Sequence, residues 1–289
     1  MHVVIAIDSS DARHTILDEI IRRPWPKESR FDVLHVTEPS HMWTLSTTAE
    51  ELSKRSAAVV EEAVVTLTKQ GLTAESVERE GDPKSVIPEY AKEVRAGLIA
   101  VGSHGVGGAT RFLMGSVSSA VLRYSPCSVW VVRARRQQTA AQRILLATDG
   151  SECSEAAARS IARHHWPQGT EIRILSVIEY FVSPETAMFN VPILTASRVE
   201  EIRTQAMVVA QDAVDEATRI IGVACDNVSQ SISVLLERPQ KVILDEAESW
   251  GADWIVVGSH GRQGLSHFLL GSVSEAVAAH AHCSVEVVR

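Results

Sequence analysis

The sequence predicts an α/β protein with two tandem doubly wound sheets, each a Rossmann-like sheet of five parallel strands in the order 3-2-1-4-5. Three observations support this fold class. Short apolar runs alternate with segments of helical period. The spelling Gly-Ser-His-Gly occurs at 102–105 and returns at 258–261. At both places the glycines stand between a β-branched run and a helix-like one, so the chain contains two copies of one unit.

In the N-terminal copy the elements follow one another in strict alternation. Strands are expected near 2–7, 31–36, 73–79, 98–101 and 128–132, and helices across about 12–23 and 47–69, after Pro83 and from Ser116. Pro83 suits a first helical turn because its missing N–H is no loss there. Ser116 and its counterpart Ser272 could cap their helices.

The C-terminal copy repeats the first with one change of spacing. Asp149 lies 141 residues after Asp8, whereas Gly258 lies 156 residues after Gly102. The second copy therefore has 15 extra residues, which we place at about 179–193, a stretch with two prolines and no helical period. This insertion could form a lid over the second site, a partner surface or a longer connection.

A polar segment without periodicity marks the boundary between the copies. We predict a first domain over 1–134, a linker over 135–142 and a second domain over 143–289. Arg133, Arg135 and Arg136 form the one basic cluster of the chain, and we expect them to be solvated as part of a connector.

Composition limits the classes of function. The 289 residues carry a formal net charge of -8, which argues against general affinity for nucleic acid, because binding to the phosphate backbone needs clustered Lys and Arg. No apolar run approaches the ~20 residues that span a bilayer, and the amino end lacks the features of a signal peptide. We expect a cytoplasmic protein that contacts neither membrane nor nucleic acid.

Two motifs in each copy should meet at one edge of the sheet. In a doubly wound sheet, ligands bind beyond the carboxyl ends of the strands at the switch point, here between the first and fourth strands. Asp8 ends the first strand and Gly102 ends the fourth, and Asp149 and Gly258 do the same in the second copy. Asp8 and Asp149 could accept a hydrogen bond from a nucleotide, hold Mg2+ through water, or stabilise a turn.

The glycine loop has the chemistry of a phosphate site without the lysine of a P-loop. Phosphate would be held by backbone N–H groups, by the helix dipole and by the hydroxyls of Ser116, Ser118, Ser272 and Ser274. His104 and His260, in the middle of the loops, are expected to point to solvent. None of these residues is assigned a catalytic role.

The repeated spacing Gly-x2-Gly-x9-Gly-Ser resembles the hallmark of the ATP-binding branch of the universal stress protein family, and the chain looks like a tandem member with two such domains. The resemblance implies an adenine nucleotide alpha-hydrolase-like fold that binds ATP, with or without Mg2+. It implies that Asp8 and Asp149 face the adenosine, that the backbone of Val36 and Val177 contacts adenine, and that the glycines and serines hold ribose and phosphates.

The candidate ATP-binding residues are therefore equivalent sets in the two copies. In the first they are Asp8, Ser9, Val36, Gly102, Ser103, Gly105, Arg111, Gly115, Ser116, Val117 and Ser118. In the second they are Asp149, Gly150, Val177, Gly258, Ser259, Gly261, His267, Gly271, Ser272, Val273 and Ser274.

The two sets differ at informative places. The family spelling Asp-Gly is present at Asp149-Gly150 but is Asp8-Ser9 in the first copy. Arg111 corresponds to His267, so the first copy has a permanent cation where the second has a titratable group. If Arg111 faces phosphate, the first copy should bind the triphosphate more tightly; the alternative is a solvated surface arginine.

Three functions remain open from the sequence: a nucleotide-binding stress-response regulator, a slow ATPase or phosphotransferase, and a nucleotide-free dimerisation scaffold. The last strands, 129–132 and 285–288, are apolar and would lie at sheet edges, which favours pairing. The family resemblance implies that these edges join the two domains as an intramolecular pseudo-dimer. A further homodimer of chains is possible.

Overall fold

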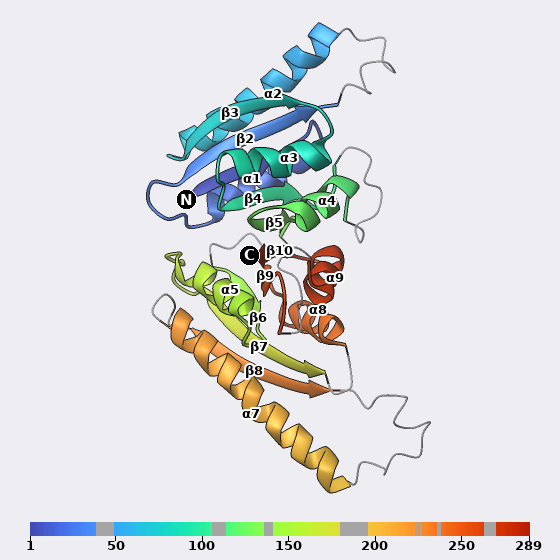
Figure 1. The fold of residues 1–289 in the computed structure, drawn as a ribbon. Coiled ribbons are helices and arrows are strands. Elements are labelled where there is room, and N and C mark those ends of the chain that lie inside the picture. Colours follow the sequence, from blue (N-terminus) through green and yellow to red (C-terminus); the bar gives the residue numbers. More distant parts are fainter. Residues whose placement is uncertain are drawn as a thin grey trace, which may run out of the picture.

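The N-terminal repeat, in a computed structural model of the protein, follows the predicted alternation (Figure 1). Its elements are β1 (His2–Ala6), α1 (Ala12–Arg22), β2 (Arg30–Thr37), α2 (Ala49–Lys69), β3 (Thr73–Glu80), α3 (Pro83–Glu93), β4 (Leu98–Gly102), α4 (Ser116–Tyr124) and β5 (Ser128–Val132). The C-terminal repeat comprises β6 (Arg143–Ala147), α5 (Glu152–Ala162), β7 (Glu171–Glu179), α7 (Ala196–Ile221), β8 (Val228–Leu235), α8 (Pro239–Trp250), β9 (Trp254–Gly258), α9 (Ser272–His280) and β10 (Ser284–Val288). The structure describes residues 1–38, 49–105, 114–135, 141–179, 196–222, 225, 227–235, 238–262 and 270–289.

The helices form where the sequence supplies an apolar stripe and a start signal. In α1 the buried Ile16, Leu17 and Ile20 recur at the spacing of one helical face. Pro83 opens α3, and the side chain of Asp82 caps it by accepting a hydrogen bond from the N–H of Lys84 at 3.0 Å. Among the described helices, none is long and apolar enough to cross a membrane.

Each repeat has the predicted strand order. β1 lies between β2 and β4 in parallel pairing, and β6 lies between β7 and β9 in the same way. The two five-stranded sheets then join edge to edge, because β5 pairs with β10 in antiparallel register with Glu286 opposite Trp130. The result is one sheet of ten strands in the order β3-β2-β1-β4-β5-β10-β9-β6-β7-β8.

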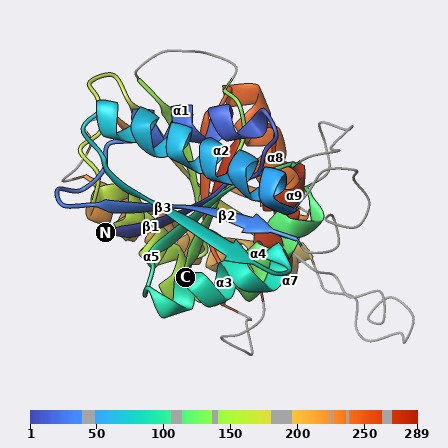
Figure 2. The ribbon, with the colours of Figure 1, turned by 90° about the horizontal axis from the view of Figure 1, so that it is seen from above.

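A hydrophobic core covers each face of this sheet and continues from one repeat into the other. Figure 2 shows α1 and α2 on one side of β1–β3 and α3 and α4 on the other. Alternate residues of each strand feed the two cores, so Val3 and Ile5 of β1 belong to one core while Val4 and Ala6 belong to the other. The first core includes residues from α1, α2, α5 and α7, and the second includes residues from α3, α4, α8 and α9.

Two arginines link the repeats across the junction, which is the contact between β5 and β10 and the helices beside them. Arg133, after β5, donates hydrogen bonds from its guanidinium to the carbonyls of Ala278 at 2.6 Å and Cys283 at 3.3 Å. Arg289, after β10, donates in the same way to the carbonyls of Leu122 and Arg123. Each arginine thus donates to at least one orphan carbonyl at the carboxyl end of the other repeat's last helix, where a cation is also favoured by the helix dipole.

The expectation of a solvated basic connector was wrong for two of its three arginines. Arg133 is buried at the junction, and burial lowers its pKa to about 10. The Arg135 guanidinium is also buried, in an ion pair with Glu19 of α1 at 2.8 Å. Arg136 lies outside the described residues. The composition of the linker does not predict these contacts, because the partner residues come from distant parts of the chain.

His164 contributes a buried, neutral polar group to the same junction. Its Nε2 accepts a hydrogen bond from Nε of Arg23 at 3.1 Å, and its Nδ1 lies 2.8 Å from the carbonyl oxygen of Ser160. This pairing requires the tautomer with the proton on Nδ1, which donates to a carbonyl in the last turn of α5. Burial, with Arg23 beside the ring, lowers the pKa of His164 to about 3.

We therefore predict that His164 makes the fold acid-sensitive. The unfolded histidine binds a proton below about pH 6.5, whereas the folded one stays neutral until about pH 3. The free energy of unfolding therefore decreases as the pH is lowered through this window. The loss can reach about 1.4 kcal/mol per pH unit. Urea unfolding between pH 7 and 5 should show a shallower slope for His164→Gln than for the wild type. The variant His165→Gln, at the exposed neighbouring position, should keep the wild-type slope, and equal slopes for all three proteins would contradict this assignment.

Candidate functional site

Asp8 and Gly105 lie together at the carboxyl edge of the sheet. They follow β1 and β4, which are parallel neighbours with Ala6 opposite Val101. A Cβ added to Gly105 would collide with Oδ2 of Asp8, so only a glycine allows this approach.

The second repeat shows the same approach, since a Cβ on Gly261 would lie 2.6 Å from Oδ2 of Asp149. The structure thus brings the two motifs together at the switch point in both repeats.

Each glycine loop is closed by a backbone hydrogen bond. The N–H of Gly115 donates to the carbonyl of Ser103 at 2.7 Å, and the N–H of Gly271 donates to that of Ser259 at 2.8 Å. The hydroxyls of Ser103 and Ser259 each lie 3.0 Å from Nδ1 of the histidine that follows. The loop therefore returns to the end of its own strand before the helix begins.

Ser118 and Ser274 fix this geometry from inside the helices. Both are buried, with 4% of their surface exposed. The hydroxyl of Ser118 donates to the carbonyl of Gly102 at 2.6 Å, and that of Ser274 donates to Gly258 at 2.9 Å. The sequence suggested a phosphate contact for these hydroxyls, whereas in the structure they tie the first helical turn to the strand end.

The helices after the loops begin at glycines, which have no side chain to cap them. Gly115 and Gly271 occupy the cap positions, so the expectation that Ser116 and Ser272 would be the caps was wrong. These serines are the first helical residues and are exposed. Among the described residues no side chain caps either helix, which leaves first-turn N–H groups and the positive end of the helix dipole for an anion. Val117 and Val273, the next residues, pack against the core.

The two aspartates each use one carboxylate oxygen to hold their own turn. Oδ1 of Asp8 accepts a hydrogen bond from the N–H of Ser10 at 3.0 Å and from the Ser10 hydroxyl, and Oδ1 of Asp149 accepts from the N–H of Ser151 at 3.0 Å. These are Asx-type turns, the structural role considered from the sequence. Across the described parts of the chain, no three His, Cys, Asp or Glu residues gather in a metal-binding group.

The loops around the aspartates differ between the repeats. Gly150 has a φ of 74°, and a Cβ there would lie 2.7 Å from Nη2 of Arg262. The backbone N–H of Arg262 donates a hydrogen bond to Oδ2 of Asp149 at 2.9 Å. In the first repeat Ser9 replaces the glycine, and Arg13 donates to its carbonyl at 3.1 Å. Sequence reasoning missed Arg262; the available signal was its position directly after Gly261, where the first repeat has Val106.

Two loop histidines differ from expectation, and a third histidine near the site was not anticipated. Nε2 of His104 and Nε2 of His260 are buried, so these rings do not point to solvent as predicted. His35, which the sequence did not single out, is buried on β2 next to Val36. Burial lowers its pKa, while the nearby carboxylates of Glu78 and Asp8 raise it. The second repeat has Ser176 at the corresponding position.

The remaining predicted positions are placed in part. Val36 and Val177 are half-buried near the ends of β2 and β7, beside the strands that carry the aspartates. Arg111 and His267 lie outside the described residues. Of the predicted insertion at 179–193, only Glu179, the last residue of β7, is described.

Comparison with known proteins gives a consistent family. A model described as the universal stress protein family matches residues 1–133 and again 140–289. A universal stress protein of Mycolicibacterium smegmatis is 26% identical over 301 aligned positions, covering 99% of this chain and 96% of the relative.

Solved structures show the same fold. A crystal structure of a universal stress protein from Archaeoglobus fulgidus covers 100% of this chain and 96% of its own, with 22% identity and a TM-score of 0.63. An Arabidopsis thaliana protein of this family with AMP bound covers 48% of this chain and 95% of its own, with 21% identity. Its TM-score is 0.33.

We predict that the two strand-end glycines differ in their tolerance of alanine. A Cβ on Gly258 would lie 2.6 to 2.8 Å from backbone atoms of Cys153 and Ser154, which cannot move without shifting α5. A Cβ on Gly102 would meet its nearest atoms at 3.3 Å, one of them the flexible end of Ile16. Gly258→Ala should therefore lower the free energy of unfolding by about 1–3 kcal/mol.

Gly102→Ala is the matched variant and should cost clearly less. Urea unfolding of both proteins measures the difference. A larger loss for Gly102→Ala than for Gly258→Ala would show that the packing around these loops is not as described.

Proposed function

The chain belongs to the universal stress protein family, and from this premise we propose that each of its two repeats binds one ATP at the glycine loop. In this proposal the protein is a stress-response regulator, and bound ATP stabilises one conformation or one assembly. The proposal assigns no catalytic step to any residue.

One observation carries the proposal. In both repeats an aspartate carboxylate lies so close to the second glycine of the loop that an added Cβ would collide with it, and the helix after the same loop begins at a glycine with no side-chain cap among the described residues. A carboxylate accepts hydrogen bonds from ribose hydroxyls, whereas helix N–H groups donate to phosphate oxygens. The two ends of the loop therefore suit the two ends of one nucleotide.

The residues divide the nucleotide between them. The backbone at Val36 or Val177 would contact adenine, and Asp8 or Asp149 the ribose. The loop N–H groups, with the exposed hydroxyls of Ser116 or Ser272, would hold the phosphates, at roughly 1.5–3 kcal/mol for each charge-assisted hydrogen bond. Ser118 and Ser274 act by positioning the loop. Mg2+ would be held mainly by phosphate oxygens.

The pairing of β5 with β10 supports a second part of the proposal, an intramolecular pseudo-dimer. The two repeats contact each other through the same strand of each unit, as the subunits of a two-fold dimer would. The proposed domains span residues 1–134 and 143–289, and residues 135–142 form the linker between them. A homodimer of whole chains stays a prediction.

The test is to denature freshly purified protein and identify the released nucleotide by mass and stoichiometry. We expect two ATP per chain, falling to about one in Asp8→Ala and in Asp149→Ala because each variant loses one ribose acceptor. Added ATP should raise the melting temperature, since a ligand at 100 times its Kd stabilises the folded state by about 2.7 kcal/mol.

Asp11→Ala is the matched control. Asp11 lies in the same loop as Asp8, is exposed and makes no side-chain cap bond to α1 among the described contacts, so its removal should leave two ATP per chain. Protein that carries no nucleotide, and whose melting temperature ignores ATP, would reject nucleotide binding and favour a scaffold. Release of ADP with measurable turnover would favour a slow ATPase.

A further inference from the structure

The junction between the repeats contains a buried ion pair with one member from each repeat. Nη1 of Arg23, at the end of α1, lies 2.8 Å from Oε2 of Glu286 on β10, and both side chains are only 2% exposed. Burial lowers the pKa of Arg23, and Glu286 raises it. A pair this deeply buried is expensive to break, because removing one partner leaves the other charge unpaired inside the protein.

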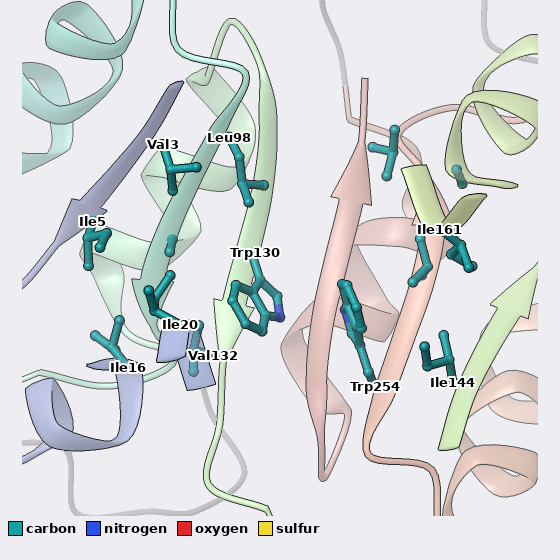
Figure 3. Packing of buried hydrophobic residues seen from close by; sticks show 14 of the residues in the cluster. Val3, Ile5, Ile16, Ile20, Leu98, Trp130, Val132, Ile144, Ile161 and Trp254 are labelled. Atoms are coloured by element: carbon teal, nitrogen blue, oxygen red, sulfur yellow. The ribbon is translucent and has the colours of Figure 1, made fainter. Parts of the chain in front are cut away.

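Aromatic rings surround the guanidinium. The Cζ of Arg23 lies 4.7 Å from the ring centroid of Trp25, 4.8 Å from that of Trp130 and 4.4 Å from that of Trp254. Trp130 on β5 and Trp254 on β9 come from different repeats and face each other across the junction, with centroids 5.5 Å apart (Figure 3). Cation–π contacts of this kind are strongest where water is excluded.

Both charged groups have a second partner in or just after α5. Nε of Arg23 donates to His164 at 3.1 Å, and the hydroxyl of Ser160 donates to Oε1 of Glu286 at 2.7 Å. The cluster is thus composed of a cation from the N-terminal repeat and, from the C-terminal repeat, an anion, a hydroxyl and a neutral imidazole.

Comparison of the repeats shows that this arrangement is not symmetric. Arg23 and His164 occupy equivalent positions, 141 residues apart, and Trp130 and Glu286 occupy equivalent positions, 156 residues apart. The cation therefore belongs to the N-terminal repeat alone and the anion to the C-terminal repeat alone. Strand register also places Trp130 directly opposite Glu286, so this position lies on the approximate two-fold axis.

Like pairing would bury like charges. Two N-terminal repeats joined in this register would bring two Arg23 side chains together, with Trp130 in both carboxylate positions. Two C-terminal repeats would place Glu286 opposite Glu286, and like charges directly opposite on paired strands are destabilising. Only unlike repeats neutralise the pair.

We propose that the surface formed by Arg23, Trp25 and Trp130 selects a C-terminal repeat as its partner and rejects a second N-terminal repeat. The selection is a difference in affinity in which the wrong pair is penalised by unpaired charge. It fits a repeat that offers a carboxylate at the centre of its last strand and a neutral histidine at the end of its first helix. The proposal does not depend on nucleotide binding.

The test uses the full chain with a protease site in place of residues 136–140, cleaved after folding. The two fragments should stay together as one 1:1 particle at micromolar concentration. Glu286→Gln should weaken their association on the order of a hundredfold, because Arg23 loses its partner inside the protein. Sedimentation or gel filtration over a dilution series measures the change.

Glu275→Gln is the matched control. Glu275 pairs with Arg123 across the same junction, but the two side chains are 34% and 56% exposed, and exposed pairs contribute little. Its effect should stay below tenfold. If the two glutamine variants weaken association equally, the buried pair has no special role and the proposal fails.

Selectivity is measured by mixing two cleaved preparations, only one of which carries a tag on its N-terminal fragment. The mixture is kept in urea at a concentration below the unfolding transition. In the wild type, the tagged N-terminal fragment should retain no more untagged N-terminal fragment than uncut chains do. The neutral double variant Arg23→Met with Glu286→Leu should keep association and gain such like pairs; this variant carries the test if Glu286→Gln does not fold. Like pairs in the wild type, or none in the double variant, would overturn the proposal.

Discussion

The antiparallel pairing of β5 with β10 is the contact on which the rest of the structure depends. It covers the apolar edge strand that each repeat would expose alone, β5 in one and β10 in the other, and it makes both cores continuous across the chain. It also carries Arg133 and Arg289 to the carboxyl ends of α9 and α4, the short helices whose amino ends border the glycine loops. The junction and the candidate sites are therefore opposite ends of the same nine-residue helices.

The two repeats share a backbone plan and differ in the side chains attached to it. Both place an aspartate against the second loop glycine and both tie the loop to its strand through a buried serine, so the frame of the site is the same. The surroundings are not: Arg262 packs over Gly150 in the second repeat, whereas Arg13 holds the turn and His35 lies near Asp8 in the first. The same division applies at the junction, where Arg23 and Glu286 make one contact out of two unlike surfaces.

Much of the fold was predictable because its signals are local. Apolar runs of strand length, Pro83 at a helix start and glycines at strand ends predicted the elements, and the switch-point rule then predicted that Asp8 and the glycine motif beginning at Gly102 would meet. The failures concern contacts made over long stretches of chain. Arg133 and Arg135 look solvated in their own segment, but their partners are 145 and 116 residues away. The loop histidines looked exposed for a similar reason, since burial depends on neighbours that a turn motif does not specify.

The two repeats form one continuous sheet of ten strands. Native-state hydrogen exchange of the backbone amides of β5 and β10 tests it most directly, because a sheet interior opens only with global unfolding whereas an edge strand frays. We expect these amides to exchange as slowly as those of the central strands β1 and β6. Exchange of β5 and β10 at rates typical of exposed edges, with β1 and β6 still protected, would contradict it.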